Sequence, residues 1–194
     1  MITRYVPIPK NAFEEGIELC IQNADNLLES ATILHNNEHY SASSFLAIQA
    51  SEEYGKALFL TDEIAEGKFT ISITRWKKVY CNHTAKSRRA RKGIQDKVCK
   101  ITDYRVTISF DGRRGEEIPE DETIDDLTKF ALKSKIESLY VDYGIIGGTD
   151  RWKSPQDNVA IIGEVDAAGA ISFAENTRIA VLETKKELGL KRKP

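Results

Sequence analysis

The sequence lacks the long apolar segments and paired cysteines that mark several classes of protein. Its 194 residues contain no run of about 18 apolar residues, so we expect no membrane-spanning helix and no membrane partner. Residues 1–10 lack the apolar core of a signal peptide. The three cysteines, Cys20, Cys81 and Cys99, form no CxxC pair and are odd in number. Reduced thiols and a cytoplasmic location are therefore expected.

The motifs of several familiar chemistries are also missing. No Glu-x-x-His pair, HExxH sequence or zinc-spaced Cys/His cluster is present, so we expect no metal and no cofactor. A P-loop, a GxGxxG sequence and a GxSxG nucleophile elbow are absent as well. The content of 41% hydrophobic and 30% charged residues excludes a disordered chain and fits one globular domain over residues 1–194.

The hydrophobic periodicity predicts a mainly α-helical bundle with a small two-stranded β excursion. Two short segments alternate between apolar and polar residues, and we expect them to be strands that pair with each other. They cover residues 69–73 and 104–110. An ordered loop is expected over residues 144–157, after a turn and an acidic loop that precede it. The expected helices span about residues 11–36, 39–66, 74–92, 124–143 and 158–188, the last capped by Gly189.

The second expected helix carries charges inside an apolar segment. Residues 41–60 are apolar nearly all the way round, which is typical of a helix buried on most sides. Glu52, Glu53 and Lys56 interrupt this segment, and buried charges are costly unless they are paired or face a wet cleft. Glu52 and Lys56 have the favourable i,i+4 order for an ion pair, and Glu53 lies at i,i+3 from the same lysine.

The face of this helix that meets its neighbours is suggested by two residues. Glu53 shares a face with Leu46 and Leu60, so we expect it to extend the stripe that faces the core. Gly55 costs about 1 kcal/mol relative to alanine inside a helix. Its presence therefore predicts that another backbone, or a ligand, comes close at this point.

The third expected helix places His83 and Lys86 one turn apart on one face. If it packs against the second helix, two carboxylates, an imidazole and ammonium groups converge. Such a set can perform acid–base chemistry or hold a phosphate. The structural alternative is an intrahelical ion pair beside a hydrogen-bonded packing histidine, and it is the simpler interpretation of the spacing alone.

Charge is distributed very unevenly. The chain has a net charge of −2, yet residues 75–100 contain ten lysines or arginines against one acid, a net +9. This asymmetry favours a nucleic-acid or phosphate partner. The alternative is a solvated helix face that is neutralised by the acidic residues of segment 116–126, and charge alone does not separate the two.

Three blocks of sequence resemble a known family. Residues 50–58, ASEEYGKAL, resemble the AEE-x-GKA signature of AbiV-type abortive infection proteins. Residues 83–86, HTAK, resemble their H-x-x-K motif, and residues 138–143, SLYVDY, with Trp152 and Pro155 resemble their LYVD…W…P segment. The blocks keep the order of the family. The resemblance implies a HEPN-like helical fold, antiphage defence by growth arrest, and a homodimer.

The sequence departs from the motif that many HEPN ribonucleases share. These enzymes carry Arg-x4–6-His, whereas seven residues separate Arg75 from His83 here. Ribonuclease activity is therefore left open, and we assign roles for the case that cleavage occurs. His83 would be the acid–base group and the two glutamates would orient it or act as bases. Lys86 and Arg88 would hold phosphate, without a metal.

The function expected from the resemblance is an antiphage effector that arrests growth or translation by binding or cleaving RNA. Its expected partners are RNA or the ribosome and a phage-encoded activator protein. The alternative is a non-catalytic dimeric interaction or switch module in phage defence. The candidate catalytic residues are Glu52, Glu53, Lys56, His83 and Lys86. The candidate RNA- or phosphate-binding residues are Arg75, Lys78, Arg88, Arg89, Arg91 and Lys92.

Overall fold

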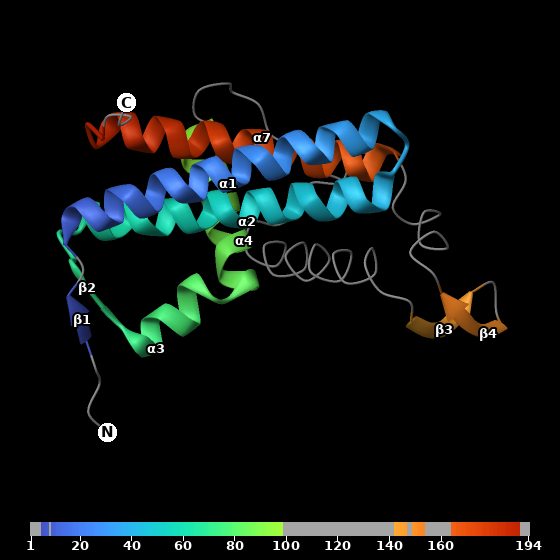
Figure 1. Ribbon diagram of the computed structural model, residues 1–194, viewed down its shortest axis with the longest axis horizontal. Coiled ribbons are helices and arrows are strands. Elements are labelled where there is room, and N and C mark those ends of the chain that lie inside the picture. Colours follow the sequence, from blue (N-terminus) through green and yellow to red (C-terminus); the bar gives the residue numbers. More distant parts are fainter. Residues whose placement is uncertain (1–4, 8, 99–141, 147–148, 154–163, 191–194) are drawn as a thin grey trace.

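The computed structural model describes residues 5–7, 9–98, 142–146, 149–153 and 164–190. This part of the chain is mainly helical, as predicted, and its long helices run side by side (Figure 1). Within it, no helix has both the length and the apolar character needed to cross a membrane. The helices are α1 (Lys10–Asn36), α2 (Tyr40–Ala65), α3 (Ile73–Arg75), η1 (Trp76–Tyr80), α4 (His83–Gly93), η2 (Ile94–Val98) and α7 (Glu164–Glu187). The strands are β1 (Tyr5–Pro7), β2 (Thr70–Ser72), β3 (Asp142–Ile146) and β4 (Thr149–Lys153).

The first two helices form an antiparallel hairpin (Figure 1). The turn between them includes Glu38, whose φ of 64° lies in the left-handed region and reverses the chain. One stripe of α1 is buried because its apolar residues recur at intervals of three and four. These buried residues are Phe13, Ile17, Cys20, Ile21, Ala24 and Ala31.

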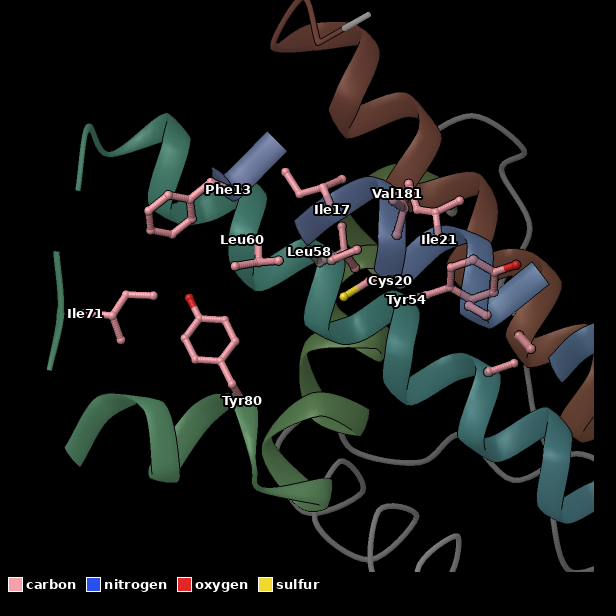
Figure 2. Close-up of a cluster of buried hydrophobic side chains, with 14 residues drawn as sticks. Phe13, Ile17, Cys20, Ile21, Tyr54, Leu58, Leu60, Ile71, Tyr80 and Val181 are labelled. Carbon is pink, nitrogen blue, oxygen red and sulfur yellow. The ribbon is translucent and has the colours of Figure 1, made fainter. Parts of the chain in front are cut away.

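Helix α2 is the centre of the bundle and contacts α1, α7 and α4. It is buried on most sides, as its apolar composition predicts, and Tyr54 and Leu58 are fully buried. Figure 2 shows these two residues among core side chains from α1 and α7. Helix α7 approaches closely because its inner face is built from small residues, of which Ala167, Ala170 and Ala174 are buried. It ends before Gly189, whose φ of +66° confirms the predicted C-cap.

The strands differ from the prediction. β2 lies within the expected strand 69–73, but its partner is β1, with Val6 opposite Ile71 in an antiparallel pair. The second expected strand, residues 104–110, lies outside the described residues. Residues 144–157 were expected to form a loop, but β3 and β4 form an antiparallel hairpin there. The helix expected over residues 124–143 does not extend to residue 143, because Asp142 and Tyr143 belong to β3.

The basic segment, residues 75–100, does not lie in the single helix that we expected over residues 74–92. It consists of α3 and η1, a break at Cys81 and Asn82, and then α4 and η2. The break has a local cause. The Asn82 side-chain oxygen accepts a hydrogen bond from the backbone N–H of Ala85 at 3.0 Å, which is an N-cap, and a new helix therefore begins at His83.

Candidate functional site

The site is built where α4 crosses α2 at Gly55. A Cβ atom at position 55 would lie 2.2 Å from the carbonyl oxygen of Lys86. Only glycine leaves room for the α4 backbone here, and the predicted close approach is confirmed. The crossing brings Lys86, and with it His83 one turn earlier, against the middle of α2.

Glu52 is the buried acid of the site. Its side chain is 1% exposed, and its Oε2 atom lies 2.5 Å from Nδ1 of His83 and 3.5 Å from Nζ of Lys86. Both partners come from the first turn of α4. The prediction that Glu53 continues the core-facing stripe was therefore wrong, because the fully buried carboxylate belongs to Glu52. The two basic partners offset the cost of burying its charge.

Glu53 forms a second ion pair beside the first. Lys56 Nζ lies 2.8 Å from Glu53 Oε2, whereas the sequence pointed equally to Glu52 as the partner of Lys56. Burial opposes the charge on Lys56, but the hydrogen bond to Glu53 keeps the pKa of the ammonium above its usual value. The Lys56 ammonium therefore stays charged next to Glu52.

Cys20 of α1 is buried and lies close enough to Lys56, Glu53 and Lys86 to interact with their charges. Burial raises the pKa of its thiol to about 11, with smaller opposing effects from Lys56 and Lys86 and a further rise from Glu53. The thiol therefore stays protonated near neutral pH. Neither Cys20 nor Cys81 is in a disulfide, and Cys99 lies outside the described residues.

The geometry of His83 suits proton transfer. Because a carboxylate can only accept hydrogen bonds, Nδ1 carries the proton that faces Glu52, and in the neutral form of this tautomer Nε2 is the basic nitrogen. The His83 side chain is 49% exposed, so a bound molecule can reach it. The described residues hold no group of three or more His, Cys, Asp or Glu side chains that could bind a metal.

Among the candidate basic residues, two are held by acids of α2, one is half-buried and three others are exposed. Arg75 binds the buried Glu63, and Arg89 binds Asp62 through Nε and Nη2 at 2.7 and 2.8 Å. Acids of α2 thus neutralise part of the basic segment, a role that we had considered only for segment 116–126, which lies outside the described residues. Arg91 is half-buried, and burial lowers its pKa. The exposed group is Lys78, Arg88 and Lys92.

Comparison with protein families identifies the chain. The family model HEPN_AbiV, described as AbiV, matches residues 12–176. The chain belongs to the AbiV family. The match covers α2, α4 and all of α1 except its first two residues, and therefore every residue of the site in this AbiV chain. Membership in a HEPN family agrees with the helical fold and indicates a role in abortive infection or defence. Comparison with curated proteins and with solved structures gave no significant match.

Four residues that shape the AbiV site were missed by the sequence analysis. Asp62 and Glu63 hold the two arginines, Tyr80 lies 3.3 Å from Glu63 Oε1, and Asn82 starts the helix that carries His83. An asparagine before a polar helical segment is an N-cap signal, so Asn82 could have been found. The acid–arginine pairs have no sequence signal, because they join different helices.

Proposed function

We propose that this AbiV-family protein arrests growth in phage-infected cells by acting on RNA, with His83 as the acid–base group. One observation supports this above all. The buried Glu52 holds Nδ1 of His83 at 2.5 Å, while the imidazole is 49% exposed at the start of the basic helix α4. A carboxylate-held histidine beside exposed cations supplies the base and the charge stabiliser that metal-independent RNA cleavage needs.

The proposed reaction needs no group outside the chain and water. Nε2 of neutral His83 takes the proton of a ribose 2′-hydroxyl, and the 2′-oxygen attacks the adjacent phosphorus. The bond from phosphorus to the 5′-oxygen breaks, and that oxygen takes a proton from a water molecule. The same water takes the proton that His83 holds, which restores the neutral imidazole. The products are a 2′,3′-cyclic phosphate and a 5′-hydroxyl. Glu52 holds the ring in one tautomer and stabilises the imidazolium that forms.

Two variants, each with one histidine replaced, test the reaction. Purified wild type, His83→Ala and His39→Ala are incubated with ribosomes, total RNA and tRNA, with and without extract of phage-infected cells. His39 is a matched control because its side chain is exposed and makes no capping hydrogen bond at the start of α2. We expect 2′,3′-cyclic phosphate ends from wild type and His39→Ala, and a loss of about 100-fold or more in His83→Ala. Intact RNA together with unimpaired translation would contradict the proposal.

Binding is tested separately from cleavage. We expect the exposed cations Lys78, Arg88 and Lys92 to contact phosphates. Replacing each by glutamate should weaken RNA binding and reduce the dependence of affinity on salt, because each contact releases counterions. Lys10→Glu is the control, since Lys10 is an exposed lysine of α1 that pairs with Glu14 at 3.7 Å. Equal salt dependence in all four variants would argue against this surface.

A second candidate is a non-catalytic switch or interaction module. The burial of Glu52 and Lys86 favours it, because their ion pair also joins α2 to α4. In that case His83→Ala and Glu53→Gln should lower the melting temperature in parallel with any loss of growth arrest. Variants that remain as stable as wild type but no longer arrest growth would exclude it.

Two partners are further parts of the proposal. HEPN membership supports a homodimer, which sedimentation equilibrium of the purified protein would detect. A phage-encoded activator is supported by the role of the family in defence. If it exists, growth arrest should depend on infection or on one co-expressed phage protein, and constant toxicity without phage would speak against it.

A further inference from the structure

Two fully buried acids lie on the same face of α2. Glu52 and Glu63 are each 1% exposed. They are eleven positions apart, which is close to three full turns and about 16 Å along the helix axis. Each receives two side chains from the basic segment. His83 and Lys86 contact Glu52, and Arg75 and Tyr80 contact Glu63.

The contacts to Glu63 involve one carboxylate oxygen. Arg75 donates to Oε1 from Nε at 2.7 Å and from Nη2 at 2.5 Å, and the Tyr80 hydroxyl donates to the same atom at 3.3 Å. Burial and the Glu63 carboxylate both raise the pKa of Tyr80, so its hydroxyl keeps the proton that it donates. The other oxygen, Oε2, is buried and has no hydrogen-bond partner among the residues that the structure describes. No other acid of the described basic segment or α2 contacts Arg75 as closely.

The break in the basic segment lies between these two groups of contacts. From Tyr80 to His83 the backbone advances by three residues, which span at most about 11 Å. The two carboxylates are about 16 Å apart along α2. The side chains of Tyr80 and His83 must therefore bridge the remainder, and Asn82 between them is extended, with φ −97° and ψ 114°. Only two residues, Cys81 and Asn82, separate Tyr80 from His83, so this short link is the route by which a displacement of Tyr80 can reach His83.

We propose that Glu63 is a positioning residue for His83. It anchors Arg75 and Tyr80 to α2, and the short link from Tyr80 then delivers the imidazole to Glu52. The proposal explains why Arg75, a candidate RNA ligand in the sequence, points its guanidinium to a buried acid. It rests on the proposed function only where it states that action on RNA depends on the position of His83.

The test uses Glu63→Gln, Tyr80→Phe, Arg75→Ala and Arg75→Lys in the full chain. Tyr80→Phe removes one hydroxyl and keeps the ring in the core, so it remains folded if a more severe variant does not. The matched control is Tyr54→Phe. Tyr54 donates to Asp25 at 2.6 Å, and Arg178 also contacts Asp25 at 2.8 Å, so this cluster has the same chemistry without the basic segment.

The main measurement reports on His83 without RNA. The protein is labelled with ¹⁵N-histidine, and the signal of His83 is assigned among the three histidines by its loss in His83→Ala. We expect the His83 ring nitrogen signals to shift in Glu63→Gln, Arg75→Ala and Tyr80→Phe, with partial rescue in Arg75→Lys. Hydrogen exchange of the amides of residues 81–83 should be about tenfold faster. Tyr54→Phe should leave both unchanged.

The outcomes separate this proposal from the proposed function. Unchanged His83 signals and exchange in folded Glu63→Gln and Tyr80→Phe would overturn the positioning role, whatever the protein does to RNA. Shifted signals support it even if wild type leaves RNA intact, which would refute only the proposed function. If wild type cleaves RNA, Tyr80→Phe should cleave about tenfold or more slowly, because a displaced acid–base group loses its alignment.

Discussion

Replacing Gly55 by alanine tests whether the close approach of α4 to α2 limits the stability of the protein. The new Cβ would lie 2.2 Å from the carbonyl oxygen of Lys86, 2.9 Å from its carbonyl carbon and 3.4 Å from Cβ of Ala90. The two nearest atoms are backbone, so no side-chain rotation can relieve the clash. Helix α4 must move away by about 1 Å, as overpacked cores do.

Two opposing effects set the size of the change. Alanine is favoured over glycine inside a helix by about 1 kcal/mol. Overpacking costs about 1–3 kcal/mol, and the shift of α4 also weakens the ion pair between Lys86 and Glu52, which is already 3.5 Å long. We expect the free energy of unfolding to fall by about 1–2 kcal/mol, which lowers the melting temperature by about 2–8 °C for a chain of this size.

Urea unfolding followed by circular dichroism measures this change, with Gly169→Ala as the control. Gly169 is also helical, in α7, but a Cβ there would meet no atom of another described element within 4 Å. It should therefore gain up to about 1 kcal/mol from helix propensity alone. If Gly55→Ala is as stable as Gly169→Ala, the contact with the Lys86 backbone does not constrain the fold, and our account of the site is wrong.

Two further predictions concern buried groups of the site. Glu52→Gln leaves the ammonium of Lys86, which is 8% exposed, without its carboxylate, so the free energy of unfolding should fall by about 3 kcal/mol. The double variant Glu52→Gln with Lys86→Met should recover part of this loss in the same urea assay. If it recovers nothing, the ion pair between Glu52 and Lys86 does not stabilise the fold. Burial raises the pKa of the Cys20 thiol from 9.0 to about 11, so the native state binds more protons than the unfolded chain between these values. The free energy of unfolding should therefore fall as pH rises from 9 to 11, by about 2 kcal/mol from this thiol, and the fall should be shallower in Cys20→Ala.

The sequence predicted which residues meet at the site better than it predicted which of these residues pair with each other. The convergence of Glu52, His83 and Lys86 depended on helical spacing and on Gly55, and these signals are local. The choice between Glu52 and Glu53 failed for a physical reason. Helix α2 is apolar on nearly every side, so its periodicity does not identify the face that meets α4. Only the position of that neighbouring helix settles which carboxylate is buried.

Long-range contacts account for the other differences. β2 pairs with β1, a short strand that ends in Pro7 and whose partner is more than sixty positions away along the chain. No periodic pattern in three residues reveals such a partner. Glu63 and Arg75 are separated by 12 positions and Asp62 and Arg89 by 27, so their pairing likewise depends on how the helices pack.

The position of α7 has a consequence for how the protein folds during synthesis. Arg178 of α7 binds Asp25 across 153 positions, and Lys185 binds Glu18 across 167. Helices α1, α2 and α4 leave the ribosome well before α7, and until then one apolar side of α2 is uncovered. A nascent or truncated chain without α7 should therefore aggregate or bind chaperones. A chain that folds in this order completes its core, and the packing behind α2, only when α7 docks.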